Sequence, residues 1–324
     1  MPDLSDIRRP VADEMKAFQK SFREAINSDI KLLNIISAYV LKNKGKQMRP
    51  LFVFLAAKVV GEVSESTYTA ASLIELMHTA TLIHDDVVDE SNERRGLFSI
   101  NALWRSKLAV LFGDYLLAKG LLLASSRKDH DLLDIVAGTV KDMSEGELLQ
   151  IQKSFKPNIE IDTYYEVIRK KTASLIATCT SSGAKSAGAS PEIIEKMYDL
   201  GINIGMAFQI KDDLFDYQTK GDIGKPTGHD LKEKKFTLPL IYALQEAGMA
   251  ERRSILKMMR NGSMNNQKIR HITDFVIENG GLEYANKMMN EYKKAAEDIL
   301  NEFPLSDART ALSDLITFTV ERKK

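Results

Sequence analysis

Six aspartates in two copies of one short pattern are the residues of this chain best suited to chemistry. The pattern Asp-Asp-x-x-Asp occurs at 85–89 and again at 212–216. Each copy lies in a long stretch without Gly or Pro, so we expect a helix that places the three carboxylates within an arc of roughly 100°. Crowded carboxylates repel one another unless a cation lies among them. The predicted metal ligands are Asp85, Asp86, Asp89, Asp212, Asp213 and Asp216.

A single copy of this pattern would be as typical of a solvated acidic helix face as of a metal site. Two copies of identical spacing favour a cage for hard divalent cations. The intervening residues, Val87 and Val88 in one copy and Leu214 and Phe215 in the other, are expected to face a core. Mg²⁺ favours such a site, because it takes a few carboxylates and completes its shell with water and phosphate oxygens. We therefore predict Mg²⁺ as the cofactor.

Basic residues accompany the predicted acidic helix ends. They are the pairs Lys46/Arg49, Arg94/Arg95 and Lys170/Lys171, and a loop that contains Lys225 and Lys235. Any one pair alone is typical of a solvated surface. Together with the carboxylates they match what two diphosphate groups need. One diphosphate would be bridged to the aspartates through Mg²⁺, and the other would be held directly by Arg forks and Lys point charges.

Helix geometry adds His78 and Gln209 to the predicted site. His78 lies seven residues before Asp85, about two turns, and Gln209 lies three residues before Asp212, so both project near the carboxylates. By contrast, His84 projects about 100° away from Asp85, toward the apolar side. We expect it to be a packed, hydrogen-bonded core histidine.

Composition excludes several classes of protein. The 324 residues include 45 Lys+Arg and 45 Asp+Glu, so the formal net charge is +0 and a nucleic-acid partner is not expected. The single cysteine, Cys179, excludes an intramolecular disulfide and favours a cytoplasmic location. Residues 1–10 lack the apolar core of a signal peptide. The most apolar stretch, 108–124, contains Asp114 and Lys119 and is interpreted as a buried helix rather than a transmembrane segment.

Helical periodicity runs through almost the whole chain, and no convincing strand pattern interrupts it. We predict an all-α fold, a single large helical domain spanning residues 1–324. A lysine- and glycine-rich loop at 219–235 would form either a flap over an anionic ligand or an ordinary mobile surface loop. The expected helices are about 10–41, 50–60, 66–89, 99–126, 130–154, 161–187, 191–218, 237–247, 251–260, 282–302 and one that begins at 306.

Further short motifs occur in a fixed order between residues 45 and 239. They are Gly45-Lys46-x-x-Arg49-Pro50, Leu82-Ile83-His84-Asp85-Asp86-Val87-Val88-Asp89, Arg94-Arg95-Gly96, Asn101-Ala102-x-Trp104, Gly113-Asp114-Tyr115-Leu116, Gly146-Glu147-x-x-Gln150, Lys171-Thr172, Phe208-Gln209-x-x-Asp212-Asp213-x-x-Asp216, Gly224-Lys225 and Lys235-x-Thr237-x-Pro239. In these motifs the sequence resembles the trans-isoprenyl diphosphate synthases, the polyprenyl synthetase family. The resemblance covers most of the chain and is very specific.

The resemblance implies a helical bundle with a central active-site cavity, a homodimer, and repeated head-to-tail condensation of isopentenyl diphosphate with an allylic prenyl diphosphate. It assigns the six aspartates to Mg²⁺ and the allylic diphosphate, and Arg94, Lys171 and Lys235 to that same diphosphate. The isopentenyl diphosphate site would contain Lys46, Arg49, His78 and Arg95. Gln209 and Lys225 also match positions that line the active site. A transient membrane contact for product release stays open.

The sequence departs from the usual family pattern at three places. It has Lys44-Gly45 where a double Gly is common, Leu97-Phe98 where Lys-Pro is common, and Lys234 where a Gly is common. None of these changes removes a charged group. The alternatives are a shorter-chain synthase, a terpene cyclase, or a non-catalytic subunit of a hetero-oligomer. A cyclase would not need the second diphosphate site, and an inert subunit should have lost acidic or basic groups.

The residues before the first trio bear on product length. Thr81 and Ala80 lie four and five residues before Asp85, and Met77 lies about one turn further down the helix. In short-chain members of the family, a bulky aromatic near this depth closes the floor of the pocket. Here the residues are small or adaptable, which favours a long-chain product. Alternatively, they are small only because two helices pack closely there.

Overall fold

The structure is a computed structural model that describes residues 3–42, 45–94, 96–154, 160–217, 228–260 and 262–322. Helices dominate it, which confirms the all-α prediction. The helices are α1 Leu4–Arg8, the 3₁₀ turn η1 Arg9–Val11, α2 Ala12–Ala25, α3 Lys31–Lys42, α4 Met48–Val60, α5 Glu65–Val88, α6 Ile100–Ser126, α7 His130–Ser154, α8 Ile161–Ile168, the π-helical turn η2 Arg169–Ala173, α9 Ser174–Ser186, α10 Pro191–Phe215, α11 His229–Lys232, α12 Leu238–Glu246, α13 Met249–Arg260, α14 Asn266–Glu278, α15 Gly281–Asn301 and α16 Asp307–Glu321.

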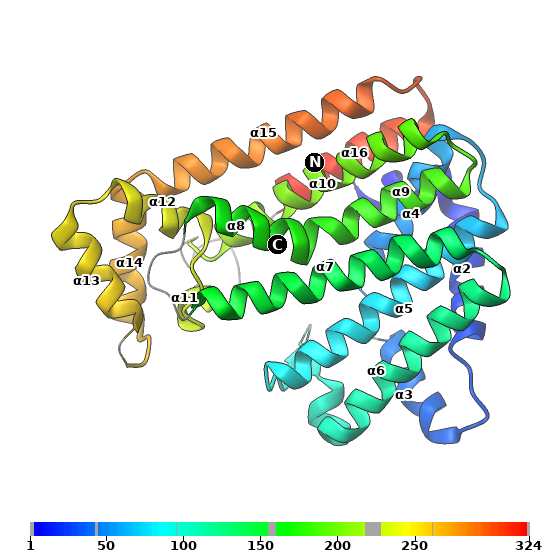
Figure 1. Cartoon of the computed structure of the whole chain (residues 1–324), viewed down its shortest axis with the longest axis horizontal. Helices are drawn as coiled ribbons and strands as arrows, with labels where there is room; N and C mark the ends of the chain where they lie inside the picture. The colour runs from blue at the N-terminus through cyan, green and yellow to red at the C-terminus, as the bar shows by residue number, and fades with distance from the viewer. Residues whose placement is uncertain are drawn as a thin grey trace.

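The two aspartate patterns end two long helices of one bundle. Figure 1 shows α15, α10, α9, α7 and α5 running across the molecule, with α11 to α14 grouped at one end. The helix with the first pattern, α5, packs along α6 and α4, and the helix with the second pattern, α10, packs along α9 and α15. Helix α4 lies in the middle: residues 51–57 are all buried, as expected for a helix that is apolar all round.

Two glycines bring α10 close to its neighbours. A Cβ atom at Gly201 would lie 2.4 Å from the Cα atom of Ala177, and one at Gly205 would lie 2.4 Å from the Cα atom of Ala173. A side chain at either position would force the helices apart. Because these two positions are glycines, α10 and its second aspartate pattern can lie close to the π-helical turn that carries Lys171.

The prediction of one helix over residues 10–41 is wrong. Residues 26–30 separate α2 from α3. The break is fixed by Asn34, whose side-chain oxygen accepts from the Ser28 backbone N–H at 3.0 Å and whose amide donates to the Ser28 carbonyl at 2.6 Å. Asn, Ser and Asp residues favour such turns because their side chains bond to nearby backbone.

The helix predicted over 161–187 is also divided, because the π-helical turn η2 separates α8 from α9. The predicted polar loop at 90–99 contains a short antiparallel hairpin of β1 Glu93–Arg94 and β2 Leu97–Phe98. Within the predicted loop 219–235, the described part begins at Gly228, directly before the short helix α11. Residues 218–227 lie outside the described residues.

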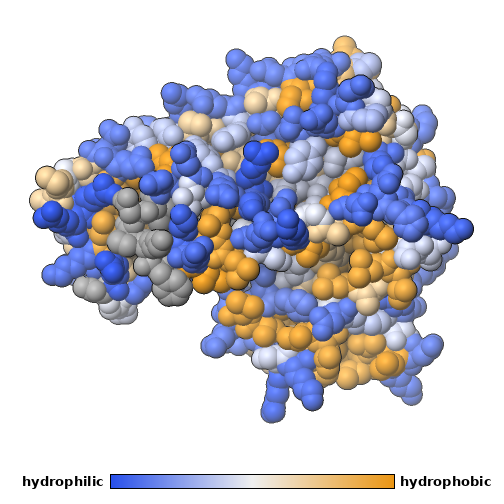
Figure 2. Space-filling model, viewed as in Figure 1, coloured by the Kyte–Doolittle hydropathy of each residue, from blue (hydrophilic) through white to orange (hydrophobic). Residues whose placement is uncertain are grey.

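Helix α6 keeps an unusually apolar exposed face. Leu103, Val110, Leu111, Leu121 and Leu122 are all more than a third exposed. Figure 2 shows apolar side chains gathered over the lower part of this view, where Figure 1 places α6. By length and composition alone, α6 is the one helix in the described ranges that could cross a membrane. The interpretation of residues 108–124 as a buried helix is wrong for Val110, Leu111, Leu121 and Leu122, although α6 packs closely along α5.

Candidate active site

The first aspartate pattern lies at the C-terminal end of α5. Asp89 caps the helix, Asp85 is half-buried, and Asp86 is only 3% exposed. The pKa of Asp85 is raised, mainly by burial and further by the charge of Glu147. The C-terminal end of a helix carries partial negative charge of its own. Three carboxylates at this helix end concentrate negative charge, which a bound cation would neutralise.

Asp86 is held by the hairpin that follows α5. Its Oδ1 accepts from Arg94 Nε at 2.8 Å and from Arg94 Nη2 at 2.7 Å. Among the intervening residues, Val87 packs against the core, but Val88 is 70% exposed. The expectation that Val88 faces the core is therefore wrong, because Asp86 takes an inward position instead.

The second pattern, at the end of α10, is more deeply buried. Asp213 Oδ2 accepts from the Tyr164 hydroxyl at 2.7 Å, and Asp213 Oδ1 accepts from Gln209 Nε2 at 2.9 Å. Burial raises the pKa of Asp213 to about 7, although both hydrogen bonds act to lower it. Leu214 and Phe215 are buried, as predicted.

Asp212 and Asp216 have different partners. Asp212 is half-buried and pairs with Arg322, which directly follows α16 and lies with its guanidinium 4.0 Å from the centre of the Phe208 ring. Asp216 accepts from the backbone N–H groups of His229, Asp230 and Leu231 at 2.7, 2.9 and 3.3 Å. It thus caps the short helix α11. A metal-ligand role for Asp216 stays a prediction.

Lys171 lies in the π-helical turn η2, next to α7. It pairs with Glu147 and donates to Gln150 Oε1 at 3.2 Å. A Cβ atom at Gly146 would lie 3.0 Å from the backbone nitrogen of Lys171, so the glycine allows α7 to approach this turn. Single π-helical turns inside α-helices are frequent at functional sites. Here the turn places a lysine beside the acidic end of α5, since its charge acts on Asp85.

Lys235 connects the two aspartate patterns electrostatically. It forms an ion pair with Glu233 at 2.6 Å and lies 4.0 Å from Asp230. Burial acts to lower its pKa, but the hydrogen bond to Glu233 and the negative charges of Glu233, Asp230 and Asp89 raise it overall. Asp89 belongs to the first pattern, whereas Lys235 lines a cavity together with Asp213 of the second. The two patterns therefore share one electrostatic environment.

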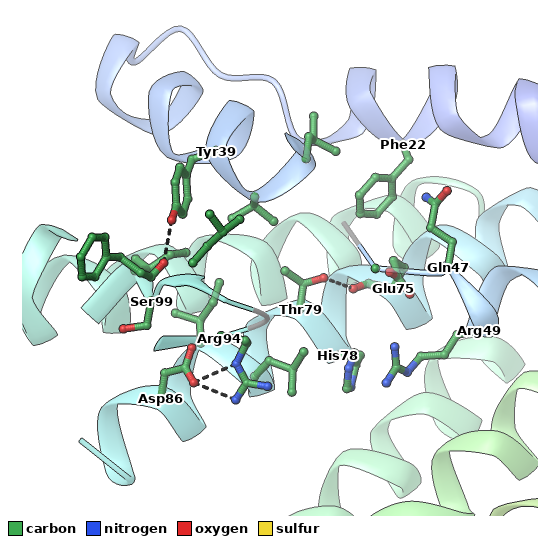
Figure 3. A pocket seen from close by; sticks show the side chains of 18 residues that line it. Phe22, Tyr39, Gln47, Arg49, Glu75, His78, Thr79, Asp86, Arg94 and Ser99 are labelled. Carbon is green, nitrogen blue, oxygen red and sulfur yellow. Dashed lines mark hydrogen bonds and ion pairs between the residues drawn. The ribbon is translucent and has the colours of Figure 1, made fainter. Parts of the chain in front are cut away.

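A first cavity, of about 110 Å³, lies beside the inward face of α5. Arg49, His78, Asp86 and Arg94 are among its lining residues. Figure 3 shows the Arg49 side chain and the His78 ring facing each other, with the Arg94–Asp86 pair further along the same side of the view. The structure thus groups Arg94 with Arg49 and His78 rather than with Lys171 and Lys235.

A second cavity, of about 140 Å³, lies between α8, η2, α10 and the segment after α11. Lys171, Gln209, Asp213 and Lys235 line it, as does Tyr164. Gln209 is fixed on both sides of its amide, because Thr172 Oγ1 donates to its Oε1 at 2.8 Å. Asp86, from the acidic end of α5, thus lines the first cavity, and Asp213, from the end of α10, lines the second, each together with cationic side chains.

Other predicted residues lie further away or outside the described part. The ammonium group of Lys46 lies 5.2 Å from the centre of the Phe318 ring of α16, and Lys46 is not among the residues that line the first cavity. Arg95 and Lys225 fall outside the described residues. His84 is packed against Gly113 of α6 and lies 3.2 Å from the Val110 carbonyl, which agrees with a packed, hydrogen-bonded histidine, though it is partly exposed.

The three residues expected to control product length lie on α5. Met77 and Ala80 are buried in the core, and Thr81 is half-buried with its hydroxyl donating to the His78 carbonyl at 2.9 Å. None of the three lines either of the two cavities described above. Their role stays a prediction.

The donor set fits Mg²⁺. Aspartate oxygens are hard ligands, and those of Asp85, Asp89 and Asp212 lie in half-buried or exposed positions at the negative ends of two helices. Asp213 adds a buried carboxylate whose charged form is disfavoured by desolvation. A divalent cation would neutralise the negative charge at the two helix ends and would favour the charged form of Asp213.

Comparison with known proteins decides the family. A model of the family "Polyprenyl synthetase" matches residues 30–276. The chain belongs to the polyprenyl synthetase family. The all-trans-nonaprenyl-diphosphate synthase (geranyl-diphosphate specific) of Rhodobacter capsulatus is 37% identical over 320 residues, which cover 98% of this chain and 97% of that protein. The octaprenyl diphosphate synthase of Escherichia coli is 34% identical, over 99% of this chain and 100% of that protein.

Solved structures of polyprenyl synthetases agree. The crystal structure of a decaprenyl diphosphate synthase from Rhodobacter capsulatus has a TM-score of 0.93 and 34% identity, and the match covers 99% of this chain and 100% of that one. The protein is therefore a polyprenyl diphosphate synthase, a prenyltransferase, with the helical fold of these enzymes.

Sequence reasoning did not find two polar residues of this polyprenyl synthetase site. Tyr164 precedes Lys171 by seven residues, but Lys171 lies in the π-helical turn η2. Regular α-helical spacing therefore does not predict the position of Tyr164 relative to the site. Arg322 follows the last helix and reaches Asp212 only through the fold. By contrast, Glu147 and Gln150 belong to a motif that could have suggested their contact with Lys171.

Proposed function

We propose that this prenyltransferase condenses isopentenyl diphosphate with an allylic prenyl diphosphate, head to tail, to make a long-chain all-trans polyprenyl diphosphate in a Mg²⁺-dependent reaction. The names of its relatives support the long-chain product, since they are nonaprenyl and octaprenyl diphosphate synthases. The identities extend over nearly the full length of those enzymes.

One observation carries the proposal: the two aspartate patterns contribute Asp86 and Asp213 to two separate cavities, and each cavity has its own cationic groups. Arg49, His78 and Arg94 line the first cavity, and Lys171 and Lys235 line the second. A reaction between two diphosphate esters needs two such anion sites, because two polyanions repel each other strongly unless each is neutralised. We assign isopentenyl diphosphate to the first cavity and the allylic diphosphate to the second.

The chemistry follows from these charges. The allylic C–O bond breaks, which leaves negative charge on the departing diphosphate and positive charge on the allyl group. Bound Mg²⁺ supplies charge neutralisation at the leaving group. Lys171 and Lys235 add fixed positive charge there, and Arg49 and His78 hold the second substrate so that its double bond faces the allylic carbon. The double bond of isopentenyl diphosphate attacks the allyl cation and forms the new C–C bond. The resulting cation loses a proton to the released diphosphate, which gives the elongated allylic diphosphate, and no nucleophile from the enzyme is needed.

We also propose that the enzyme acts as a homodimer and that the exposed apolar face of α6 is the contact. Five large apolar side chains on that helix are more than a third exposed: Leu103, Val110, Leu111, Leu121 and Leu122. A contiguous apolar surface of this kind is typical of a protein interface. A second copy of the same chain would bury it symmetrically.

The decisive experiment is an incubation of the purified protein with Mg²⁺, labelled isopentenyl diphosphate and, in separate reactions, geranyl, farnesyl and geranylgeranyl diphosphate. We expect label in products longer than geranylgeranyl diphosphate, and no incorporation when EDTA replaces Mg²⁺. A product that stops at farnesyl or geranylgeranyl length would contradict the long-chain assignment. Conversion of the allylic substrate alone, without incorporation of label, would indicate a cyclase instead.

A further inference from the structure

Tyr164 contributes a buried hydroxyl to the second aspartate pattern. Its side chain extends from α8 and is 6% exposed, and its hydroxyl donates to Asp213 Oδ2 at 2.7 Å. The same side chain lines the second cavity, with Lys171 and Lys235. No resemblance or spacing argument assigns this tyrosine a role.

The hydrogen bond from Tyr164 completes a chain of contacts that fixes Asp213. Thr172 donates to Gln209 at 2.8 Å, and Gln209 donates to Asp213 Oδ1 at 2.9 Å. The donor from Tyr164 then fixes the remaining oxygen, Oδ2. Each oxygen of a carboxylate has two lone-pair directions, so each can accept one hydrogen bond and still face a cation. Asp213 is thus oriented from both sides while retaining the capacity to bind metal.

Asp212 shows the contrast within the same pattern. It is half-buried and its partner is Arg322, a long side chain from the chain end beyond α16. Asp213 instead contacts a short, rigid aromatic side chain that is itself packed in the core with Ile168 and Ile210. A tyrosine ring has few rotamers to lose, so its hydroxyl is a well-fixed donor.

We propose that Tyr164 is a positioning residue that orients Asp213 for the divalent cation bound with the allylic diphosphate. The proposal rests on the proposed function of the second aspartate pattern as a metal site. Groups that hydrogen-bond to metal ligands fix ligand orientation, and their loss typically weakens metal binding or activity about 10- to 100-fold. Tyr164 would therefore act on the reaction through Asp213, without touching the reacting atoms.

The neighbouring tyrosine provides a matched control. Tyr165 lies on the same helix, and its ring packs at 6.1 Å from the Tyr292 ring. Its hydroxyl is buried and has no hydrogen-bond partner in the described part of the chain. Tyr164→Phe and Tyr165→Phe thus remove the same atom from adjacent positions, and in both variants the ring is kept. Only the first change removes a hydrogen bond to Asp213.

The experiment measures binding of Mn²⁺ to the full-length protein in the presence of inorganic diphosphate, by the electron paramagnetic resonance signal of free Mn²⁺. For Tyr164→Phe we expect the dissociation constant to rise about tenfold or more, and for Tyr165→Phe to change less than about twofold. In rate assays, the Mg²⁺ concentration for half-maximal activity should rise by a similar factor in Tyr164→Phe. High Mg²⁺ should then restore most of kcat, which a purely structural defect would not permit.

Thermal melts in EDTA separate packing from positioning. If Tyr164→Phe lowers the melting temperature but binds Mn²⁺ within twofold of the wild type, the hydroxyl is only structural and the proposal is wrong. Tighter Mn²⁺ binding would also overturn it, because Tyr164 would then compete with the metal. Failure of the wild type to incorporate isopentenyl diphosphate while it still binds Mn²⁺ would count against the proposed function and not against the role of Tyr164.

Discussion

Asp213 is a carboxylate whose charged form is disfavoured in the folded protein. Burial raises its pKa from 3.8 to about 7. Between these two values the folded state holds a proton that the unfolded state has released. The metal-free protein should therefore lose stability as the pH rises through this window, by roughly 1.4 kcal/mol per pH unit from this group.

The test is urea unfolding in EDTA at pH 5 and pH 7, for the wild type and Asp213→Asn. We expect the variant to lose clearly less stability than the wild type between these two pH values, because an amide does not titrate. Asp212→Asn, at the half-buried neighbour, is the control and should keep most of the pH dependence of the wild type, because burial is the largest cause of the raised Asp213 pKa and the charge of Asp212 a lesser one. An equal loss in the wild type and in Asp213→Asn would show that Asp213 does not carry the effect.

Arg49 is the residue that tests the assignment of the first cavity. It lines that cavity, and its guanidinium lies next to the His78 ring. Loss of a charged hydrogen bond to a diphosphate costs about 1.5–3 kcal/mol, so Arg49→Ala should raise the KM for isopentenyl diphosphate roughly 10- to 100-fold. The KM for the allylic substrate should change less than about twofold.

Lys171→Ala gives the reciprocal measurement, since Lys171 lines the second cavity. This variant should weaken binding of the allylic substrate more than binding of isopentenyl diphosphate. Equal effects of each variant on both substrates would contradict the assignment of one diphosphate to each cavity.

At the scale of the element, α5 relates the aspartates to product length. Ala80 lies five residues before Asp85, about 7.5 Å along the helix, and is fully buried. Ala80→Phe or Thr81→Phe should shorten the product while the first condensations keep a near-normal rate. Product chromatography of both variants checks this, with Val88→Phe as a control at an exposed position of the same helix. Unchanged products in both active variants would place the floor of the pocket elsewhere.

Helix α16 connects the chain end with the second aspartate pattern. Arg322 pairs with Asp212 and lies over the Phe208 ring. In EDTA, Arg322→Ala should lower the free energy of unfolding by about 1 kcal/mol, because an ion pair and a cation–π contact are lost. The difference should shrink with Mg²⁺ and inorganic diphosphate, since a metal at Asp212 replaces the guanidinium as the countercharge.

The control for this variant is Lys293→Ala, which removes a cation 3.2 Å from Glu321 but none beside Asp212. Its effect on unfolding should be the same with and without Mg²⁺. An Arg322→Ala difference that Mg²⁺ leaves unchanged would contradict exchange of the countercharge.

At the scale of the whole molecule, the apolar face of α6 predicts self-association. Leu121 and Leu122 are 55% and 66% exposed. Changing both to Asp should convert a dimer into a monomer of 36.4 kDa, because two buried carboxylates on each side would oppose association. Light scattering coupled to size exclusion measures the mass.

Leu305→Asp is the matched control, because Leu305 is 84% exposed and lies before α16, away from α6. This variant should remain a dimer. If the wild type is a monomer at micromolar concentration, or if the Leu121/Leu122 variant stays dimeric, the α6 face is not the contact.

The sequence alone determined the features that depend on local geometry. Helical periodicity predicted the all-α fold, and the spacing of the aspartates placed three carboxylates at the end of each of two helices, because neighbours along a helix fix each other's direction. The sequence did not predict the break at residues 26–30, where the Asn34 side chain forms hydrogen bonds with the Ser28 backbone. That break depends on a side-chain contact that competes with helix continuation.

Only the tertiary structure decided how these local groups meet. Packing placed Arg94 with Arg49 and His78, and Lys171 with Asp213 and Lys235. It also made Asp216 a cap for α11, brought Arg322 to Asp212, and set the Tyr164 hydroxyl against Asp213. These contacts join segments far apart in the chain, and their partners are selected by helix packing and burial. No local period in the sequence encodes them.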